Sequence, residues 1–188
     1  ALVISEVVKN SPADKAELRS KDIITAVNGQ PLKKVVPSAL LPLWFNIYMA
    51  DKKPKDTLTL SVLREEQPQV LSITLGKYPL LERNAPRQYL PRLGFTLREM
   101  TVHDGIVHRL FDAKIKGVVA SFVKPNAPAS NAEMKTLDRI MEIDGTEVTD
   151  YAQALELLEK IDKDLQKREA VLMIHRGTDT KVLHLQLN

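Results

Sequence analysis

The sequence predicts an α+β fold, mostly β, built as two similar small domains. Three observations predict it: one pattern occurs twice along the chain, each copy contains short β-branched or alternating runs, and each copy contains one short and one long helical segment. A length of 188 residues accommodates two such domains. We expect each domain to be a small, partly closed antiparallel sheet capped by its two helices.

An internal duplication appears when the chain is aligned with itself at an offset of 116 residues (Val3 with Val119). Identical residues then recur in order and without a gap, including Asn10/Asn126, Pro12/Pro128, Asp22/Asp138 and Gly29/Gly145. A second block matches residues 60–75 to 172–187 at a slightly smaller offset, with Arg64 opposite Arg176. The order of the matching residues and the positions of the turn-forming Pro and Gly are preserved over most of both copies, which indicates a duplicated structural unit.

The first half of each copy contains two strands, a short helix and a turn. The β-branched runs 2–8 and 118–123 predict the first strand. An Asn-x-Pro-Ala turn follows, because proline fixes its own φ and restricts the residue before it. Residues 13–18 and 129–134 then predict a short helix, and 22–27 and 138–143 a second strand. Asn-Gly and Asp-Gly pairs end these strands in tight turns.

The second half of each copy contains the long helix and a closing pair of strands. Residues 149–161 predict an amphipathic helix with Thr149 or Asp150 as its N-cap, and residues 37–50 predict a more apolar helix in the first copy. Gly and Pro punctuate the stretch between the copies. We therefore expect a first domain at 1–80, a linker at 81–92 and a second domain at 93–188.

Composition excludes several classes of function. The net charge is only +3 with the charges scattered, and aromatics make up 5%, so a nucleic-acid surface is not expected. No apolar run approaches the ~20 residues of a membrane span. The chain has no cysteine, which excludes disulfides and thiolate metal sites. Because the chain starts at Ala1 inside an apolar run, we expect a fragment or a processed chain.

The sequence predicts neither catalytic residues nor a cofactor. No serine lies in a Gly-x-Ser-Gly context, and the dispersed glycines form no phosphate loop. His103 and His108 are five residues apart, one more than the spacing that places two ligands on one helix face, so no metal site is expected. Their segment is expected to form a lid or insertion between Leu97 and Gly117. His175 and His184 are expected at exposed strand positions.

The run "SPADKAELRSKDIITAVNGQPL" (residues 11–32) resembles PDZ domains of the bacterial, circularly permuted type. Two such units in tandem resemble the C-terminal part of HtrA-like serine proteases, and the resemblance covers nearly the whole chain. Two glycines of the family's pattern are replaced in each copy, by Glu17 and Lys21 and by Glu133 and Leu137. Because glycine usually serves a positive φ, we expect these turns to be remodelled.

The resemblance implies that the module binds extended peptides, commonly at their C-termini. "RLGFTL" matches the family's carboxylate-binding loop and peptide-pairing strand in the second copy, while the first copy has no counterpart before Ala1, so its groove is expected to be incomplete. The candidate peptide-binding residues are Arg92, Leu93, Gly94, Phe95, Thr96, Leu97, Ala154, Leu155 and Leu158. The alternative is that Phe95 and Leu97 are core residues and that Arg92 is merely exposed.

The resemblance also implies a parent protein. The chain is expected to be the regulatory, substrate-recruiting part of an HtrA-like serine endopeptidase whose catalytic domain lies outside it. A non-catalytic scaffold or adaptor and a site-2 type protease remain alternatives. Expected partners are C-termini or extended segments of unfolded proteins and, through the protease domain, further copies of the parent. Neither nucleic acid nor a membrane span is expected, and the implied compartment is extracytoplasmic, the bacterial periplasm.

Overall fold

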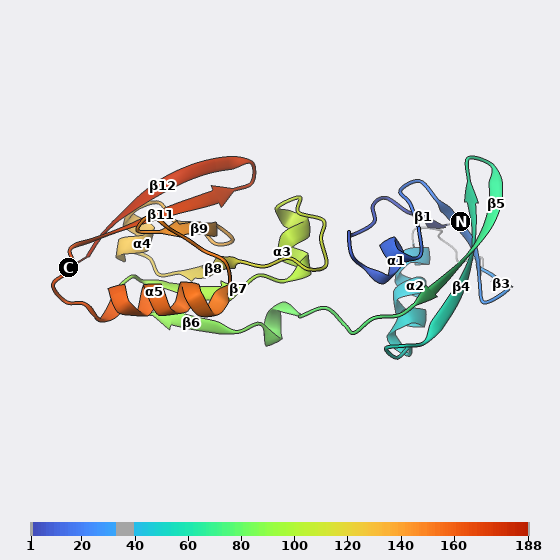
Figure 1. Cartoon of the computed structure of the whole chain (residues 1–188), viewed down its shortest axis with the longest axis horizontal. Helices are drawn as coiled ribbons and strands as arrows, with labels where there is room; N and C mark the ends of the chain where they lie inside the picture. Colours follow the sequence, from blue (N-terminus) through green and yellow to red (C-terminus); the bar gives the residue numbers. More distant parts are fainter. Residues whose placement is uncertain (1, 33–39, 188) are drawn as a thin grey trace. The chain divides into compact units, whose positions relative to one another are not determined.

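The computed structural model describes residues 2–32 and 40–187, which divide into two compact units (Figure 1). The first unit comprises Ala1–Pro79 with Phe111–Ala113, and the second comprises Leu80–Leu110 with Lys114–Asn188. Each unit has one antiparallel sheet with helices packed on it, which confirms the predicted α+β, mostly β fold. No helix in the described ranges is long and apolar enough to cross a membrane.

The sheet of the first unit runs in the order β1-β2-β4-β5, with β3 paired to β2. Its elements are β1 (Leu2–Val3), α1 (Pro12–Lys15), β2 (Ile23–Val27), β3 (Gln30–Pro31), α2 (Leu41–Ala50), β4 (Thr57–Arg64) and β5 (Gln67–Thr74). The strand predicted at 2–8 is only two residues long, because no strand among the described residues pairs with 5–8. The helix predicted at 37–50 begins at Leu41, and its residues 37–39 lie outside the described ranges.

The sheet of the second unit runs in the order β12-β11-β9-β8-β7-β6, with β10 paired to β9. Its elements are η2, a 3₁₀ turn (Glu82–Asn84), β6 (Arg87–Leu90), β7 (Phe95–Glu99), α3 (Val102–Val107), β8 (Val118–Val123), α4 (Pro128–Asn131), β9 (Arg139–Ile143), β10 (Thr146–Glu147), α5 (Tyr151–Lys163), β11 (Glu169–Arg176) and β12 (Asp179–Gln186). Part of the expected linker 81–92 is therefore strand β6. Its strand conformation comes from pairing with β7 rather than from a pattern in its own residues.

The duplicated motif has the same backbone in both units. Asn28 and Gly29 have φ values of +48° and +74°, and Asp144 and Gly145 have +47° and +77°, as a type I′ hairpin turn requires. These turns connect β2 to β3 and β9 to β10. The predicted tight turns are thus confirmed.

The turns in which other residues replace glycine are not remodelled. Glu17, Lys21, Glu133 and Leu137 have φ values of +62°, +71°, +62° and +70°. Each L-residue in this left-handed region costs about 1–2 kcal/mol. The expectation of remodelling was wrong. The neighbouring strands hold the backbone of these turns in the positive-φ conformation, and the replacing residues bear the strain.

An ion pair recurs at the same place in each unit. The buried Asp22 carboxylate accepts hydrogen bonds from Arg64 Nε at 2.8 Å and Nη2 at 2.7 Å, and from the Arg19 N–H at 2.8 Å. Asp138 accepts corresponding bonds from Arg176 at 2.7 and 2.6 Å. The acid before each second strand therefore closes the preceding turn and fixes it to β4 or β11.

Candidate functional site

The loop between β6 and β7 is a tight turn that only glycine allows. Gly94 has a φ of +79°, and a Cβ built on it would lie 2.2 Å from the Cβ of Ala127. The Gly94 N–H donates to the carbonyl of Leu90 at 2.7 Å. The backbone at "LGF" therefore packs directly against the start of α4.

The predicted apolar residues meet in one cluster. Leu93, Phe95 and Leu97 come from the loop and β7, and Ala154 and Leu158 come from α5. All five are fully buried and belong to the core of the second unit. These five candidates therefore stabilise the fold of the second unit, and their contact with a peptide remains a prediction.

Two of the remaining candidates are half-buried. Leu155 is half-buried and packs against the core. Thr96 is also half-buried and lies between Tyr89 of β6 and Phe122 of β8 in the sheet. Their predicted contact with a peptide remains a prediction.

Arg92 holds the end of α5 in this structure. Its guanidinium donates to the carbonyls of Ile161 at 3.2 Å and Asp164 at 2.6 Å, and also to that of Lys167. These are carbonyls at or beyond the last turn of a helix, where a positive charge is favourable. The predicted role of Arg92 in peptide binding remains a prediction.

The amides of the loop already bind a carboxylate. The N–H groups of Arg92 and Leu93 both donate to Oδ1 of Asp162, at 2.9 and 3.0 Å. Successive N–H groups of this kind form an anion-binding nest. The family resemblance implied a carboxylate-binding loop at "RLGFTL" but gave no indication of Asp162. An aspartate in the last turn of a helix is unfavourable for the helix dipole and could have signalled a specific partner.

Strand β6 lies along β7 and against α5 (Figure 1). It runs antiparallel to β7, with Gln88 opposite Leu97 and Leu90 opposite Phe95. Leu90 is 1% exposed and belongs to the core. Since β8 pairs with the other side of β7, both sides of β7 carry a strand.

The segment after β7 is fixed by a buried ion pair. Arg98 donates to both oxygens of Asp104 at 2.8 Å, and Thr101 closes a capping box on the same carboxylate. Burial acts to raise the pKa of Asp104, but the hydrogen bonds from Arg98 and Thr101 outweigh it, so the pKa is lowered overall. This pair orders α3 in the predicted insertion.

The histidines of this insertion do not form a metal centre with other ligands. His108 Nε2 lies 2.9 Å from the carbonyl oxygen of Leu137. Across residues 2–32 and 40–187, no three His, Asp or Glu side chains gather to hold a metal ion.

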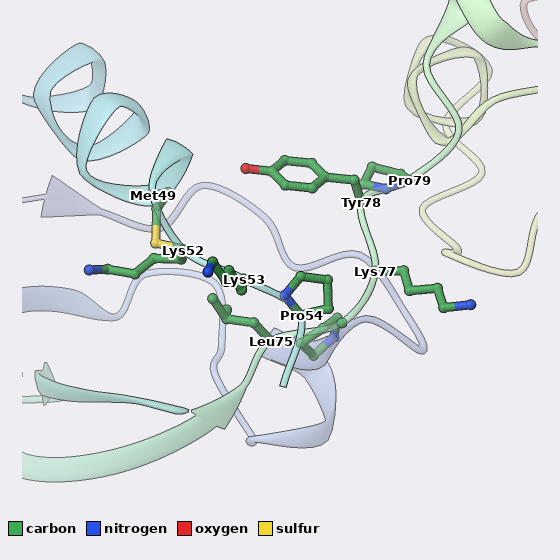
Figure 2. Close-up of a pocket in the computed structure, with 10 residues that line it drawn as sticks. Met49, Lys52, Lys53, Pro54, Leu75, Lys77, Tyr78 and Pro79 are labelled. Carbon is green, nitrogen blue, oxygen red and sulfur yellow. The ribbon is translucent and has the colours of Figure 1, made fainter. Parts of the chain in front are cut away.

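The first unit contains a cavity of about 220 Å³ between the end of α2 and the chain after β5 (Figure 2). Its lining combines apolar surface, including Met49 and Leu75, with lysines. Lys52 lies 4.4 Å from the ring centre of Tyr48, and Figure 2 shows Lys77 extending away from the cavity. Because the charges do not converge, no ligand chemistry is evident here.

The first unit has a second cavity, of about 250 Å³, and the equivalent residues of the second unit are packed in its core. The cavity is lined by Ile24, Leu60 and Ile73 among other apolar residues. The repeat aligns these with Ile140, Leu172 and Leu185, which pack in the cluster that contains Phe95 and Leu97. Among the described residues, the first unit has no strand in the place of β7.

Comparison with known proteins finds curated relatives along nearly the whole chain. A probable periplasmic serine endoprotease DegP-like of Chlamydia pneumoniae is 25% identical over 98% of this chain and 35% of its own length. The protein of the same name from Marinomonas sp. (strain MWYL1) is 30% identical over 91% of this chain and 34% of its own length. The chain thus spans about a third of the curated relatives it matches. A crystal structure of the HtrA3 PDZ domain bound to a phage-derived ligand matches 55% of this chain and 86% of that one, at 19% identity and a TM-score of 0.39.

The family model described as PDZ domain matches residues 1–75 and 91–187. These two segments contain most of the two duplicated copies, and together they cover most of the chain. The predicted resemblance to the tandem PDZ region of HtrA-like proteases is confirmed. The chain belongs to the PDZ domain family and carries one copy of the domain in each matched segment.

Proposed function

We propose that the second unit binds extended peptides along β7, in the groove between this strand and α5. One observation supports the proposal: an extended segment, β6, pairs antiparallel with β7 and contacts α5. Leu90, the last residue of that segment, belongs to the same buried apolar cluster as Leu93, Phe95, Leu97 and Leu158. A peptide in the same place forms the same backbone ladder.

The physical basis is strand addition. Backbone hydrogen bonds along β7 supply affinity for many sequences, and the apolar cluster selects the terminal side chain. Burial of a leucine side chain contributes roughly 1.5–3 kcal/mol. The nest formed by the amides of Arg92 and Leu93 suits a terminal carboxylate, since it holds the carboxylate of Asp162 here.

The parent protein is proposed to be an HtrA-like serine endopeptidase in the bacterial periplasm. The support is that the relatives are named periplasmic serine endoproteases and that this chain corresponds to about a third of their length. In such a protein the tandem PDZ unit recruits unfolded chains through their C-termini and assembles with further copies through the protease domain.

Peptide binding is tested by fluorescence polarisation on the full chain with a library of free C-terminal hexapeptides. We expect selection of apolar termini, and a change of the terminal leucine to alanine should weaken binding about tenfold or more, because most of its buried area is lost. Matched peptides that end in a carboxamide control for the carboxylate. If no peptide binds, or if binding is indifferent to the last side chain, the proposed function is refuted.

A further inference from the structure

We propose that β6 is an intramolecular ligand of the second unit, which imitates a bound C-terminal peptide and must leave before an external peptide can enter. This role rests on the peptide-binding function proposed above. It assigns to residues 87–90 the part of a built-in competitor, and it also defines the chemistry of the external ligand.

The backbone of β6 occupies the pairing side of β7. The register sets Arg87 opposite Arg98 and Leu90 opposite Phe95. The ladder continues one step further, where the Glu99 N–H donates to the carbonyl of Pro86 at 2.9 Å. An added strand needs these same donors and acceptors, so it cannot pair with β7 while β6 is in place.

The side chain and carbonyl of Leu90 fill the places of a ligand's last residue. Leu90 is buried among the apolar residues of the loop, β7 and α5. Its carbonyl accepts the Gly94 N–H at 2.7 Å, a contact that a terminal carboxylate oxygen would otherwise make. Asp162 supplies the remaining negative charge to the amides of Arg92 and Leu93. The groove therefore has its strand, its apolar side chain and its carboxylate from within the chain.

Strand β6 is short enough to be displaced. It has four residues and forms the edge of the sheet, and its first two residues, Arg87 and Gln88, are exposed. Leu90 is its one fully buried side chain. The apparent affinity of an external peptide is then its intrinsic affinity reduced by the fraction of molecules in which β6 has left.

The sequence of β6 describes the preferred ligand. Leu90 indicates a leucine-sized terminal residue. Tyr89 lies 6.3 Å, centre to centre, from the exposed Phe122 ring of β8, which indicates an aromatic residue just before it. The expected ligand is a peptide that ends in an aromatic residue followed by leucine, and the hexapeptide Ala-Pro-Arg-Gln-Tyr-Leu with a free carboxylate serves as the probe.

A reversible cross-link tests whether β6 must leave. Tyr89 and Thr96 are directly opposite each other in the ladder. Hydrogen-bonded and non-hydrogen-bonded pairs alternate along an antiparallel ladder, and the Glu99 N–H bonds to the carbonyl of Pro86, so Tyr89 and Thr96 form a non-hydrogen-bonded pair. Such pairs have Cα atoms about 4.5 Å apart, within disulfide range. The native chain has no cysteine, so Tyr89→Cys/Thr96→Cys forms one defined bond in the full chain.

The labelled probe is titrated against the oxidised and reduced forms of this one variant, and the library of free C-terminal peptides against the reduced form. We expect oxidation to weaken probe binding at least tenfold and dithiothreitol to restore it. Equal affinity of the two forms would overturn the competitor while leaving peptide binding intact. Binding of library peptides but not of the probe would overturn the ligand chemistry read from β6. Failure of every peptide with the reduced form would instead count against the proposed function.

A second variant covers the case in which the double cysteine chain does not fold. By the same alternation of pairs along the ladder, the N–H of Gln88 points toward Leu97, and Gln88→Pro removes it. Because the side chain of Gln88 is exposed, this substitution leaves the core unchanged. Gln88→Ala keeps the N–H and is the matched control. Loss of one backbone hydrogen bond corresponds to about three- to tenfold in the population of released β6, so the probe should bind Gln88→Pro that much more tightly. Equal affinity of the proline and alanine variants would overturn the proposal.

Discussion

Substitution of Gly94 by alanine should destabilise the second unit through two separable costs. An L-residue at its φ of +79° costs about 1–2 kcal/mol. The new Cβ would also lie 2.2 Å from the Cβ of Ala127, and relief of such overpacking costs typically about 1–3 kcal/mol. The sum predicts a loss of about 2–5 kcal/mol in the free energy of unfolding. Native-state hydrogen exchange of the buried strand β8 measures it within the affected unit.

Gly145 provides the matched control for this substitution. Its φ is +77°, but a Cβ built there meets no atom within 4 Å. Gly145→Ala should therefore cost only the backbone share, about 1–2 kcal/mol. Ala127→Gly combined with Gly94→Ala should recover most of the difference, because the obstructing methyl group is gone. Equal costs at the two glycines, or no recovery in the double variant, would refute the steric argument.

Three further predictions concern stability. Glu133→Gly should raise the free energy of unfolding by up to about 1 kcal/mol, because release of left-handed strain exceeds the entropy cost of glycine. In urea denaturation the control Lys135→Gly should instead lower the free energy of unfolding, because Lys135 has no positive φ to relieve. The arginine hydrogen bonds to Asp22 lower its pKa below the ordinary value near 3.8, so the stability that they contribute is present above about pH 4 and is lost as the pH falls through the lowered pKa. Denaturation at pH 7 and pH 3 should therefore show that Asp22→Asn loses less stability in acid than the native chain does. An equal loss of stability in the two proteins would contradict this. Asp104→Ala removes the close, buried partner of Arg98 and leaves this fully buried guanidinium with the exposed carboxylate of Glu82 at 4.0 Å. It should cost about 3–5 kcal/mol in urea denaturation, and a loss below 1 kcal/mol would contradict the buried pair.

The repeat was enough to predict the architecture, but not which repeated residues touch. Asp22 and Asp138 were matched in one block, and Arg64 and Arg176 in another. The structure pairs the acid of each copy with the arginine of the same copy. Sequence comparison aligns equivalent positions and carries no information on contacts between blocks, so the ion pairs became visible only in three dimensions.

Strand β6 could not be predicted from its own residues. Arg87–Leu90 has no alternation of apolar and polar residues and is flanked by prolines, which are typical of a linker. Its strand conformation comes from the partner strand β7, and strand formation depends strongly on such context. The same limit applies to Asp162, whose partners lie about 70 residues earlier in the chain.

The apolar candidates lie in one buried cluster, but the sequence could not tell whether these positions form a ligand pocket or a core. Phe95, Leu97 and Leu158 are apolar at the spacing of a strand and a helix, and a ligand pocket and a core give the same pattern. In the structure all three are fully buried with Leu90 beside them. Charged substitutions at these positions would therefore test folding rather than binding, which is why the variants above change β6 and the half-buried Thr96 instead.

Amide chemical shifts of the full ¹⁵N-labelled chain, followed during titration with Ala-Pro-Arg-Gln-Tyr-Leu, test most directly whether the second unit binds peptides along β7. We predict that the largest shifts fall on residues 93–99, on α5 and on β6, whose amides report its release. Shifts confined to the first unit, or to the second unit outside β6, β7 and α5, would contradict the account.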